Sequence, residues 1–338
     1  MLKRLALLIA LSSLMLHASD LVKIYLNQGL DAVGVAIEKE LTQKDFWLSE
    51  IGDKNISLGY YDDNVAIVLT NKTDKILRVY SYEDGKIRKD FEQKEIITGL
   101  MGDKKIEGDL KTPVGFYELG RKFNPGDPYY GPFAFATTYP NLLDKVQGKT
   151  GGGIWIHGYP LDGSRLDEFK TRGCIALFNN NLEKFAKVVQ DKKVFVMTEE
   201  KEKIRAKKDQ IASLLADLFT WKLAWTNSDT NAYLSFYDEQ EFKRFDKMKF
   251  EQFASMKKSI FSRKEDKKIK FSDINISPYP NLENETMYRI SFYEDYYTKN
   301  YRFRGDKILY VKIDSKGKMK ILAAQLFETE NHLYHCNF

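Results

Sequence analysis

Two short apolar runs, each bracketed by glycine, constrain this chain more than any other feature of its sequence. Residues 151–158 read GGGIWIHG and residues 171–177 read TRGCIAL. Both runs are brief and β-prone, so we expect two buried strands or turns, with His157 at the end of the first and Cys174 just before the second. The chain has only four histidines and two cysteines. A histidine and a cysteine fixed in this way predict a nucleophile and its base.

The residue types suit acyl transfer through a thiolate. A free thiol has a pKa of about 8.5, so a nearby imidazole is needed to lower it and to pass a proton to the leaving amine. Gly173 permits a tight turn, in which backbone N–H groups near Cys174 converge where an oxyanion would form. The pattern therefore predicts a cysteine acyl-transfer site.

Other interpretations of these residues remain open at this point. Cys174 could be a small buried hydrophobe, and His157 could be a turn residue that satisfies its own hydrogen bonds. Cys174 could also form a structural disulfide with Cys336. The glycine-flanked pattern favours catalysis, and Cys336 lies at the end of a separate predicted domain.

These motifs resemble the YkuD family of L,D-transpeptidases. That family carries His-Gly, a gap of some sixteen residues, and then [Ser/Thr]-His-Gly-Cys; His157, Gly158, Thr171, Gly173 and Cys174 fall on this pattern. A second signature, Thr-Pro-x-Gly, appears at residues 112–115. The resemblance spans residues 56–198. It implies a peptidoglycan stem peptide as substrate, Cys174 as nucleophile, His157 as general base and the Gly158 carbonyl as the group that orients the imidazole.

The same resemblance places the oxyanion hole in the backbone around Arg172, Gly173 and Cys174. Two positions depart from the family: Arg172 stands where histidine is usual, and Ala176 stands where arginine is frequent. Arg172 is either a partner for a substrate carboxylate or a surface cation. We expect Thr171 and Arg172 to lie near the substrate.

An aromatic loop precedes the histidine strand. Its Tyr129 and Tyr130 stand in a turn-rich segment, residues 124–132. They would either line a substrate groove or pack the loop itself.

The C-terminal part of the chain resembles an NTF2-like domain. The resemblance lies in residues 221–225 (WKLAW) and 229–237 (DTNAYLSFY). The two domains in this order resemble the cell-shape-determining L,D-carboxypeptidases of helical bacteria, which trim tetrapeptide stems to tripeptides. Hydrolysis is therefore the predicted reaction. The alternatives are an L,D-transpeptidase using the same acyl-enzyme, and a non-catalytic wall-binding protein.

We predict a mainly β catalytic domain, a YkuD-like β-sandwich with short helices, followed by an α+β NTF2-like domain. The predicted boundaries are a signal peptide over 1–19, a helical segment over 20–55, the catalytic domain over 56–198, a charged linker over 199–210 and the NTF2-like domain over 211–338. The length and the 43% hydrophobic content suit two cores.

The N-terminus predicts export to the periplasm. Lys3 and Arg4 precede an apolar run over residues 5–16 and then the small residues Ala18 and Ser19. The run is too short for a membrane span of about 20 residues, although an uncleaved anchor remains the alternative. The formal net charge of +5 is too mild to indicate nucleic acid as a partner.

Periodicity predicts the elements. A helical region over 20–50 carries an apolar stripe, which packs on its own catalytic domain or, alternatively, forms a homodimer contact. We expect strands at 65–69, 76–80, 94–98 and 194–197, a helix over 182–189 capped by Asn181, and a solvated helical linker over 199–208. Helices over 211–262 and strands at 269–276, 287–293, 302–313 and 319–327 would form a cup with an unknown ligand.

The sequence indicates no metal and no cofactor. His332, His335 and Cys336 invite a metal site, but three candidate ligands in a tail are weak evidence, and a frayed tail is the simpler interpretation.

Overall fold

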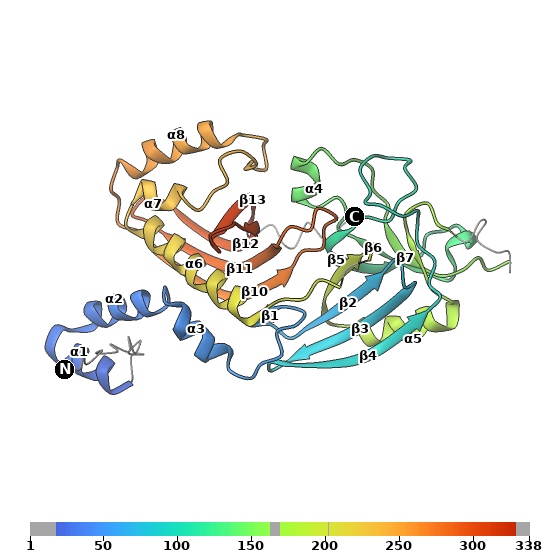
Figure 1. Cartoon of the computed structure of the whole chain (residues 1–338), viewed down its shortest axis with the longest axis horizontal. Coiled ribbons are helices and arrows are strands. Elements are labelled where there is room, and N and C mark those ends of the chain that lie inside the picture. The colour runs from blue at the N-terminus through green and yellow to red at the C-terminus, as the bar shows by residue number, and fades with distance from the viewer. Residues whose placement is uncertain (1–17, 163–169, 202, 329–338) are drawn as a thin grey trace, which may run out of the picture.

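The computed structural model describes residues 18–162, 170–201 and 203–328. Two β-sheet domains lie side by side, and a helical arm extends from them at the N-terminus (Figure 1). The predicted signal peptide, apart from its last two residues, and the tail with Cys336 lie outside the described residues.

The catalytic motifs lie in an eight-stranded sheet. Its strand order is β4-β3-β2-β9-β5-β6-β7-β8. The bounds are β2 Val65–Asn71, β3 Ile76–Glu83, β4 Lys86–Lys94, β5 Gly115–Phe123, β6 Ala134–Thr137, β7 Trp155–His157, β8 Ile175–Ala176 and β9 Lys193–Glu199. The 3-10 turn η1 spans Pro128–Tyr130, helix α4 spans Leu142–Val146 and helix α5 spans Asn179–Val189. The mainly β architecture predicted for this domain is confirmed.

The centre of this sheet is buried on both faces. Every residue of β2 is buried, and β2 pairs in parallel with β9. A continuous apolar strand of this kind is typical of one covered on both sides. On one side Phe185 of α5 packs on Phe91 and Phe135. The other side joins a core shared with the second domain.

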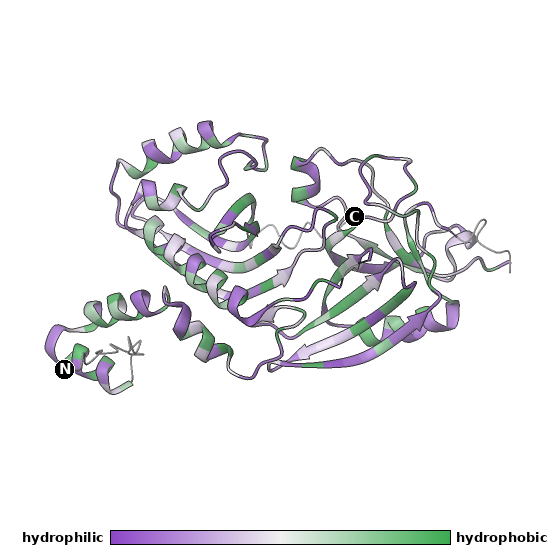
Figure 2. Cartoon of the chain, in the orientation of Figure 1, coloured by the Kyte–Doolittle hydropathy of each residue, from purple (hydrophilic) through white to green (hydrophobic). Residues whose placement is uncertain are grey.

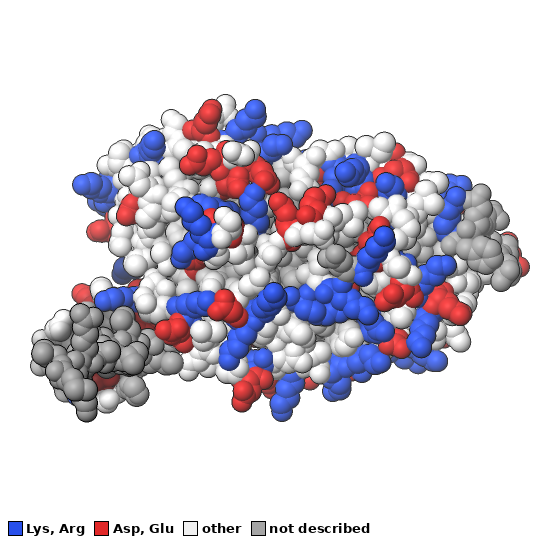
Figure 3. Space-filling model, viewed as in Figure 1, with Lys and Arg blue, Asp and Glu red and all other residues white. Residues whose placement is uncertain are grey.

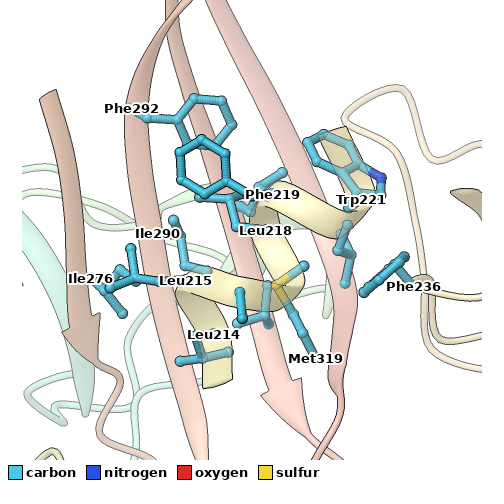
Figure 4. Packing of buried hydrophobic residues seen from close by; sticks show 14 of the residues in the cluster. Leu214, Leu215, Leu218, Phe219, Trp221, Phe236, Ile276, Ile290, Phe292 and Met319 are labelled. Atoms are coloured by element: carbon cyan, nitrogen blue, oxygen red, sulfur yellow. The ribbon is translucent and has the colours of Figure 1, made fainter. Parts of the chain in front are cut away.

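The C-terminal domain folds a long helix onto a curved sheet. Helices α6 (Lys208–Thr226), α7 (Thr230–Leu234) and α8 (Phe250–Phe261) precede strands β10 (Lys268–Pro278), β11 (Met287–Tyr297), β12 (Arg302–Ile313) and β13 (Met319–Glu328). Leu214, Leu215, Leu218 and Trp221 of α6 pack against Ile276, Ile290 and Met319 of the sheet (Figure 4). Apolar residues of α6 and of the strands cluster where the two face each other (Figure 2). The α+β arrangement predicted for this domain, helices followed by a meandering sheet, is confirmed.

The two domains share a strand and a core. Strand β1, Tyr60–Tyr61, pairs with β10 and so extends the C-terminal sheet from a segment that precedes the catalytic strands. The Asn141 side-chain amide donates to the Tyr279 hydroxyl at 3.0 Å, and buried Arg289 forms an ion pair with Glu118. We infer that the domains form one packed unit.

The N-terminal region forms three helices, α1 (Ala18–Gln28), α2 (Leu30–Glu40) and α3 (Lys44–Ile51). The prediction that it packs on the catalytic domain was wrong. Trp47 of α3 stacks on Phe219 of α6, because its indole finds an apolar partner on the C-terminal domain. Helices α1 and α2 bury no residue, and Leu26 and Leu30 are 74% and 72% exposed.

Three local predictions were also wrong. The strand expected at 94–98 is instead β4, because Asp84 and Gly85 both adopt positive φ and turn the chain back at once. Within the linker expected to be helical over 199–208, residues 200–201 and 203–207 form no helix; Ala206 is buried and its N–H donates to the Ser57 carbonyl. Helix α5 begins at Asn179, so Asn181 lies inside it rather than capping it.

The charge on the surface does not single out a binding face. Lys and Arg are interspersed with Asp and Glu over the face shown in Figure 3. Within the described residues, none of the helices combines the length and the apolar character needed to cross a membrane.

Candidate active site

Cys174 and His157 lie on neighbouring segments of the same sheet. Strands β7 and β8 run in parallel with His157 opposite Ala176, and the N–H of Leu177 donates to the carbonyl of His157 at 2.9 Å. Cys174, two residues before Ala176, therefore comes level with Trp155. The backbone N–H of Trp155 donates to the Cys174 Sγ at 3.4 Å. The ladder thus brings together two residues seventeen positions apart.

The geometry defines the tautomer of the imidazole. Nδ1 of His157 lies 2.7 Å from the carbonyl oxygen of Gly158. A carbonyl can only accept, so Nδ1 carries the proton and Nε2 keeps its lone pair. The side chain is 1% exposed, and burial lowers the pKa of His157 to about 4. At neutral pH the ring is an uncharged base.

The thiol is buried and protonated at rest. Cys174 is 8% exposed, and its Sγ–H donates to the Gly153 carbonyl at 3.3 Å. Burial raises the pKa of Cys174 to about 11, opposed by the Trp155 N–H and by the charge of Lys104. A thiol and an imidazole that are both neutral suit a mechanism in which the proton moves only as substrate is attacked.

Hydrogen bonds within the turn before Cys174 fix its conformation. The Thr171 hydroxyl donates to the Cys174 carbonyl at 2.6 Å and accepts the N–H of Gly173 at 3.2 Å. The hydroxyl of Thr112 also reaches that carbonyl, at 3.5 Å. Thr171 is buried and bonded to the backbone of the turn, whereas Arg172 between these residues is exposed.

An aromatic wall stands beside the histidine. The ring of Tyr130 packs edge-on against His157 at 5.1 Å and against Trp155 at 5.0 Å. Tyr129 packs on Tyr130 and is 38% exposed. Tyr130 therefore holds the imidazole from the side, while Tyr129 faces solvent at the rim.

Sequence reasoning missed two buried lysines and one partly buried lysine, Lys149, behind this site. Lys72 binds the carbonyls of Gly102 and Thr112. Lys104 pairs with Asp109, and Lys149 pairs with Asp103. Lysine is usually exposed, and no spacing rule marks one that is buried, so only the fold could reveal them.

The C-terminal cup holds a further buried charge pair that the sequence did not indicate. Lys307 on β12 binds Glu294 on β11 at 2.7 Å, and its ammonium lies 4.2 Å from the centre of the Trp225 ring. Lys257 lies over Trp225 and Tyr233, and burial together with Lys307 lowers the pKa of Lys257 to about 7. Across the part of the chain that the structure describes, no three His, Cys, Asp or Glu residues gather as metal ligands would.

Three family models match the chain in succession. They are the cell-shape determining Csd6 N-terminal dimerization domain over 17–51, the YkuD L,D-transpeptidase catalytic domain over 65–197 and the Cds6 C-terminal NTF2-like domain over 213–325. A partial relative is YafK of Escherichia coli (strain K12), named among the L,D-transpeptidases. It is 30% identical over 99 residues, which are 29% of this chain and 36% of YafK.

Two solved structures match most of the chain rather than a single domain of it. The helical cell shape determining protein Pgp2 from Campylobacter jejuni is 98% identical, with a TM-score of 0.82, and the match covers 84% of this chain and 100% of that one. Bd1075 from Bdellovibrio bacteriovorus is 27% identical, with a TM-score of 0.64, over 80% of this chain and 96% of that one. The chain therefore belongs to the YkuD family of L,D-transpeptidases, in the group of cell-shape determinants that carry a Csd6-like dimerization segment and a C-terminal NTF2-like domain.

Proposed function

We propose that this chain is a periplasmic peptidoglycan L,D-carboxypeptidase that removes the terminal D-alanine from tetrapeptide stems and leaves tripeptides. The observation that supports the proposal most directly is that Cys174 precedes the strand paired with that of a neutral His157, whose Nδ1–H donates to the Gly158 carbonyl. The match to the YkuD L,D-transpeptidase catalytic domain supports a reaction at the bond between the L-centre of the diamino acid and the terminal D-alanine. The match to the cell-shape determining Csd6 segment supports removal of that D-alanine rather than cross-linking, because the cell-shape-determining enzymes that the chain resembles trim their substrates.

In the proposed acylation, Sγ of Cys174 attacks the carbonyl of the L-centre of the diamino acid. The thiol proton passes to Nε2 of His157, and backbone N–H groups of the turn at Gly173 and Cys174 stabilise the oxyanion. The imidazolium then protonates the departing D-alanine amine. The Gly158 carbonyl keeps the ring oriented throughout, because it accepts from Nδ1–H in both charge states of the ring.

Deacylation decides between the two candidate reactions. Water attacking the thioester gives a tripeptide, whereas an amine from a second stem gives a cross-link. The exposure of Arg172 on the turn beside Cys174 is consistent with its proposed role as the partner of a substrate carboxylate. The exposed Tyr129, next to Tyr130, would line the same groove.

The test is a digest of tetrapeptide muropeptides with the full chain and with Cys174→Ala, read by mass spectrometry. Loss of one alanine, absent in the variant, supports the carboxypeptidase. Cross-linked dimers would make the chain a transpeptidase instead. If neither product forms while the protein remains folded, a wall-binding role without catalysis replaces both.

The N-terminal arm supports a second part of the proposal, a homodimer. The match to a dimerization domain covers 17–51, and helices α1 and α2 expose their apolar residues in the single chain. The signal-like residues 1–19 support the proposed export. We also propose a role in cell shape, in line with the name of the Campylobacter relative.

A further inference from the structure

The loop over residues 99–111 lies directly against the turn that carries the nucleophile. Its two ends are tied together, since the N–H of Gly99 donates to the Thr112 hydroxyl at 2.8 Å. A Cβ added to Gly173 would lie 2.8 Å from the carbonyl oxygen of Lys111. The backbone of the loop and the backbone of the turn are therefore in contact.

Lys104 is a buried lysine of this loop. Its side chain is 4% exposed, and its Nζ binds Asp109 Oδ1 at 2.9 Å and the Ile106 carbonyl at 3.1 Å. Asp109 in turn accepts the backbone N–H groups of Lys105, Ile106 and Lys111. These bonds, with Lys104, hold the pKa of Asp109 at about 2 despite its burial. The ammonium is therefore held in place by a carboxylate that the loop itself holds.

The glycine segment 151–153 contacts both the Lys104 side chain and the thiol. A Cβ added to Gly151 would lie 3.3 Å from Cε of Lys104, so the lysine stem runs directly behind that residue. Two residues further on, the Gly153 carbonyl accepts from Cys174 Sγ, and the Trp155 N–H donates to it. The ammonium thus lies behind the segment that encloses the sulfur.

The other ionisable groups near the sulfur do not supply this charge. His157 is neutral at rest, and Tyr130 supplies no positive charge, since burial raises the pKa of its hydroxyl. Arg172 is exposed, so that solvent screens it. Of the buried lysines behind the site, Lys104 is the one whose charge lowers the pKa of Cys174.

We propose that Lys104 is the fixed cation of the nucleophile pocket, positioned by Asp109 to stabilise the negative charge that forms on Cys174 and then moves to the oxyanion. The inference rests on the proposed role of Cys174 as nucleophile. In the step concerned, the proton moves from Sγ to Nε2 of His157, the sulfur electron pair forms the C–S bond, and the carbonyl π pair moves to oxygen. Lys104 gives up no proton. It is a positioning residue that acts through the field of its charge.

The experiment measures the thiol itself rather than turnover. In the full chain with Cys336→Ser, the rate of iodoacetamide alkylation of Cys174 is followed against pH. Lys104→Met should raise the alkylation pKa by about one unit, which is about tenfold slower labelling below that pKa, and Lys104→Arg should restore at least half of the shift. Lys149→Met is the matched control, because it removes a partly buried lysine that is paired with Asp103 of the same loop, and should leave the thiol pKa within about 0.2 units.

A folded Lys104→Met protein with an unchanged thiol pKa would overturn the inference, as would an equal shift in Lys149→Met. If Lys104→Met does not fold, Asp109→Asn decides the matter, since removing the countercharge should lower the thiol pKa, and an unchanged or raised value contradicts the inference. The proposed function fails by a different result. If Cys174→Ala still hydrolyses muropeptides, Cys174 is not the nucleophile, whatever the alkylation profile shows.

Discussion

Nδ1 of His157 and the carbonyl oxygen of Gly158 lie 2.7 Å apart, so one hydrogen bond fixes both the tautomer and the orientation of the catalytic ring. The ring can accept the thiol proton only while Nε2 is unprotonated. Because burial lowers the pKa of His157 to about 4, the base is available at any pH above that value and is lost as the pH falls through it. We expect the acid limb of kcat/KM near pH 4. An acid limb at the ordinary imidazole value of about 6.5 would contradict this assignment.

Gly173→Ala should abolish most activity. The glycine has φ +121°, and an added Cβ would meet the Lys111 carbonyl oxygen at 2.8 Å, so the turn must move away from the loop. Displaced oxyanion donors typically cost about 10²–10³ in kcat. Gly152→Ala is the control, because nothing lies within 4 Å of its added Cβ. Steady-state kinetics on tetrapeptide muropeptides should separate the two variants, and equal losses would count against the turn as the oxyanion site.

Tyr130→Ala should lower kcat by about tenfold with a smaller change in KM, since the ring that packs on His157 and Trp155 is lost and the imidazole loosens. Tyr130→Phe keeps the ring and should retain most activity. Kinetics on both variants test whether packing or the hydroxyl matters. A Phe variant as impaired as the Ala variant would show that the hydroxyl is what the reaction needs.

Tyr279→Phe should destabilise the chain by about 1–2 kcal/mol, because the buried Asn141 amide loses its acceptor across the domain boundary. The shared core predicts that both domains unfold together. Urea unfolding followed by far-UV circular dichroism and by tryptophan fluorescence should give coincident transitions. Two separate transitions would mean that the domains are energetically independent.

Leu26→Asp should dissociate the proposed homodimer while leaving the fold intact. Leu26 is 74% exposed in the single chain, so the charge costs little unless a partner covers that face. Asp31→Asn, on the neighbouring helix α2, is the control. Sedimentation at micromolar concentration measures the change. A native dimer that survives Leu26→Asp would place the contact elsewhere on the arm.

Much of the fold could be predicted because local pattern and final structure agree. The β-branched run at 65–69 is strand β2, and the four long C-terminal strands lie where alternation placed them. The errors fall where a turn or a contact between distant segments decides the local structure. The turn at Asp84 and Gly85 determines where strand β4 begins. Trp47 packs on Phe219, and the N–H of Ala206 donates to Ser57, so both residues have partners far away in the sequence.

The sequence by itself singled out the two residues that we propose react. His157 and Cys174 stand in glycine-rich motifs whose residue types and order have few other uses, and their rarity in the chain makes them conspicuous. Only the tertiary structure decided their charge states and their surroundings. A pKa depends on burial and on the charges close by in space, so neither the neutral His157 nor the buried Lys104 can be recognised until loops distant in sequence have packed together.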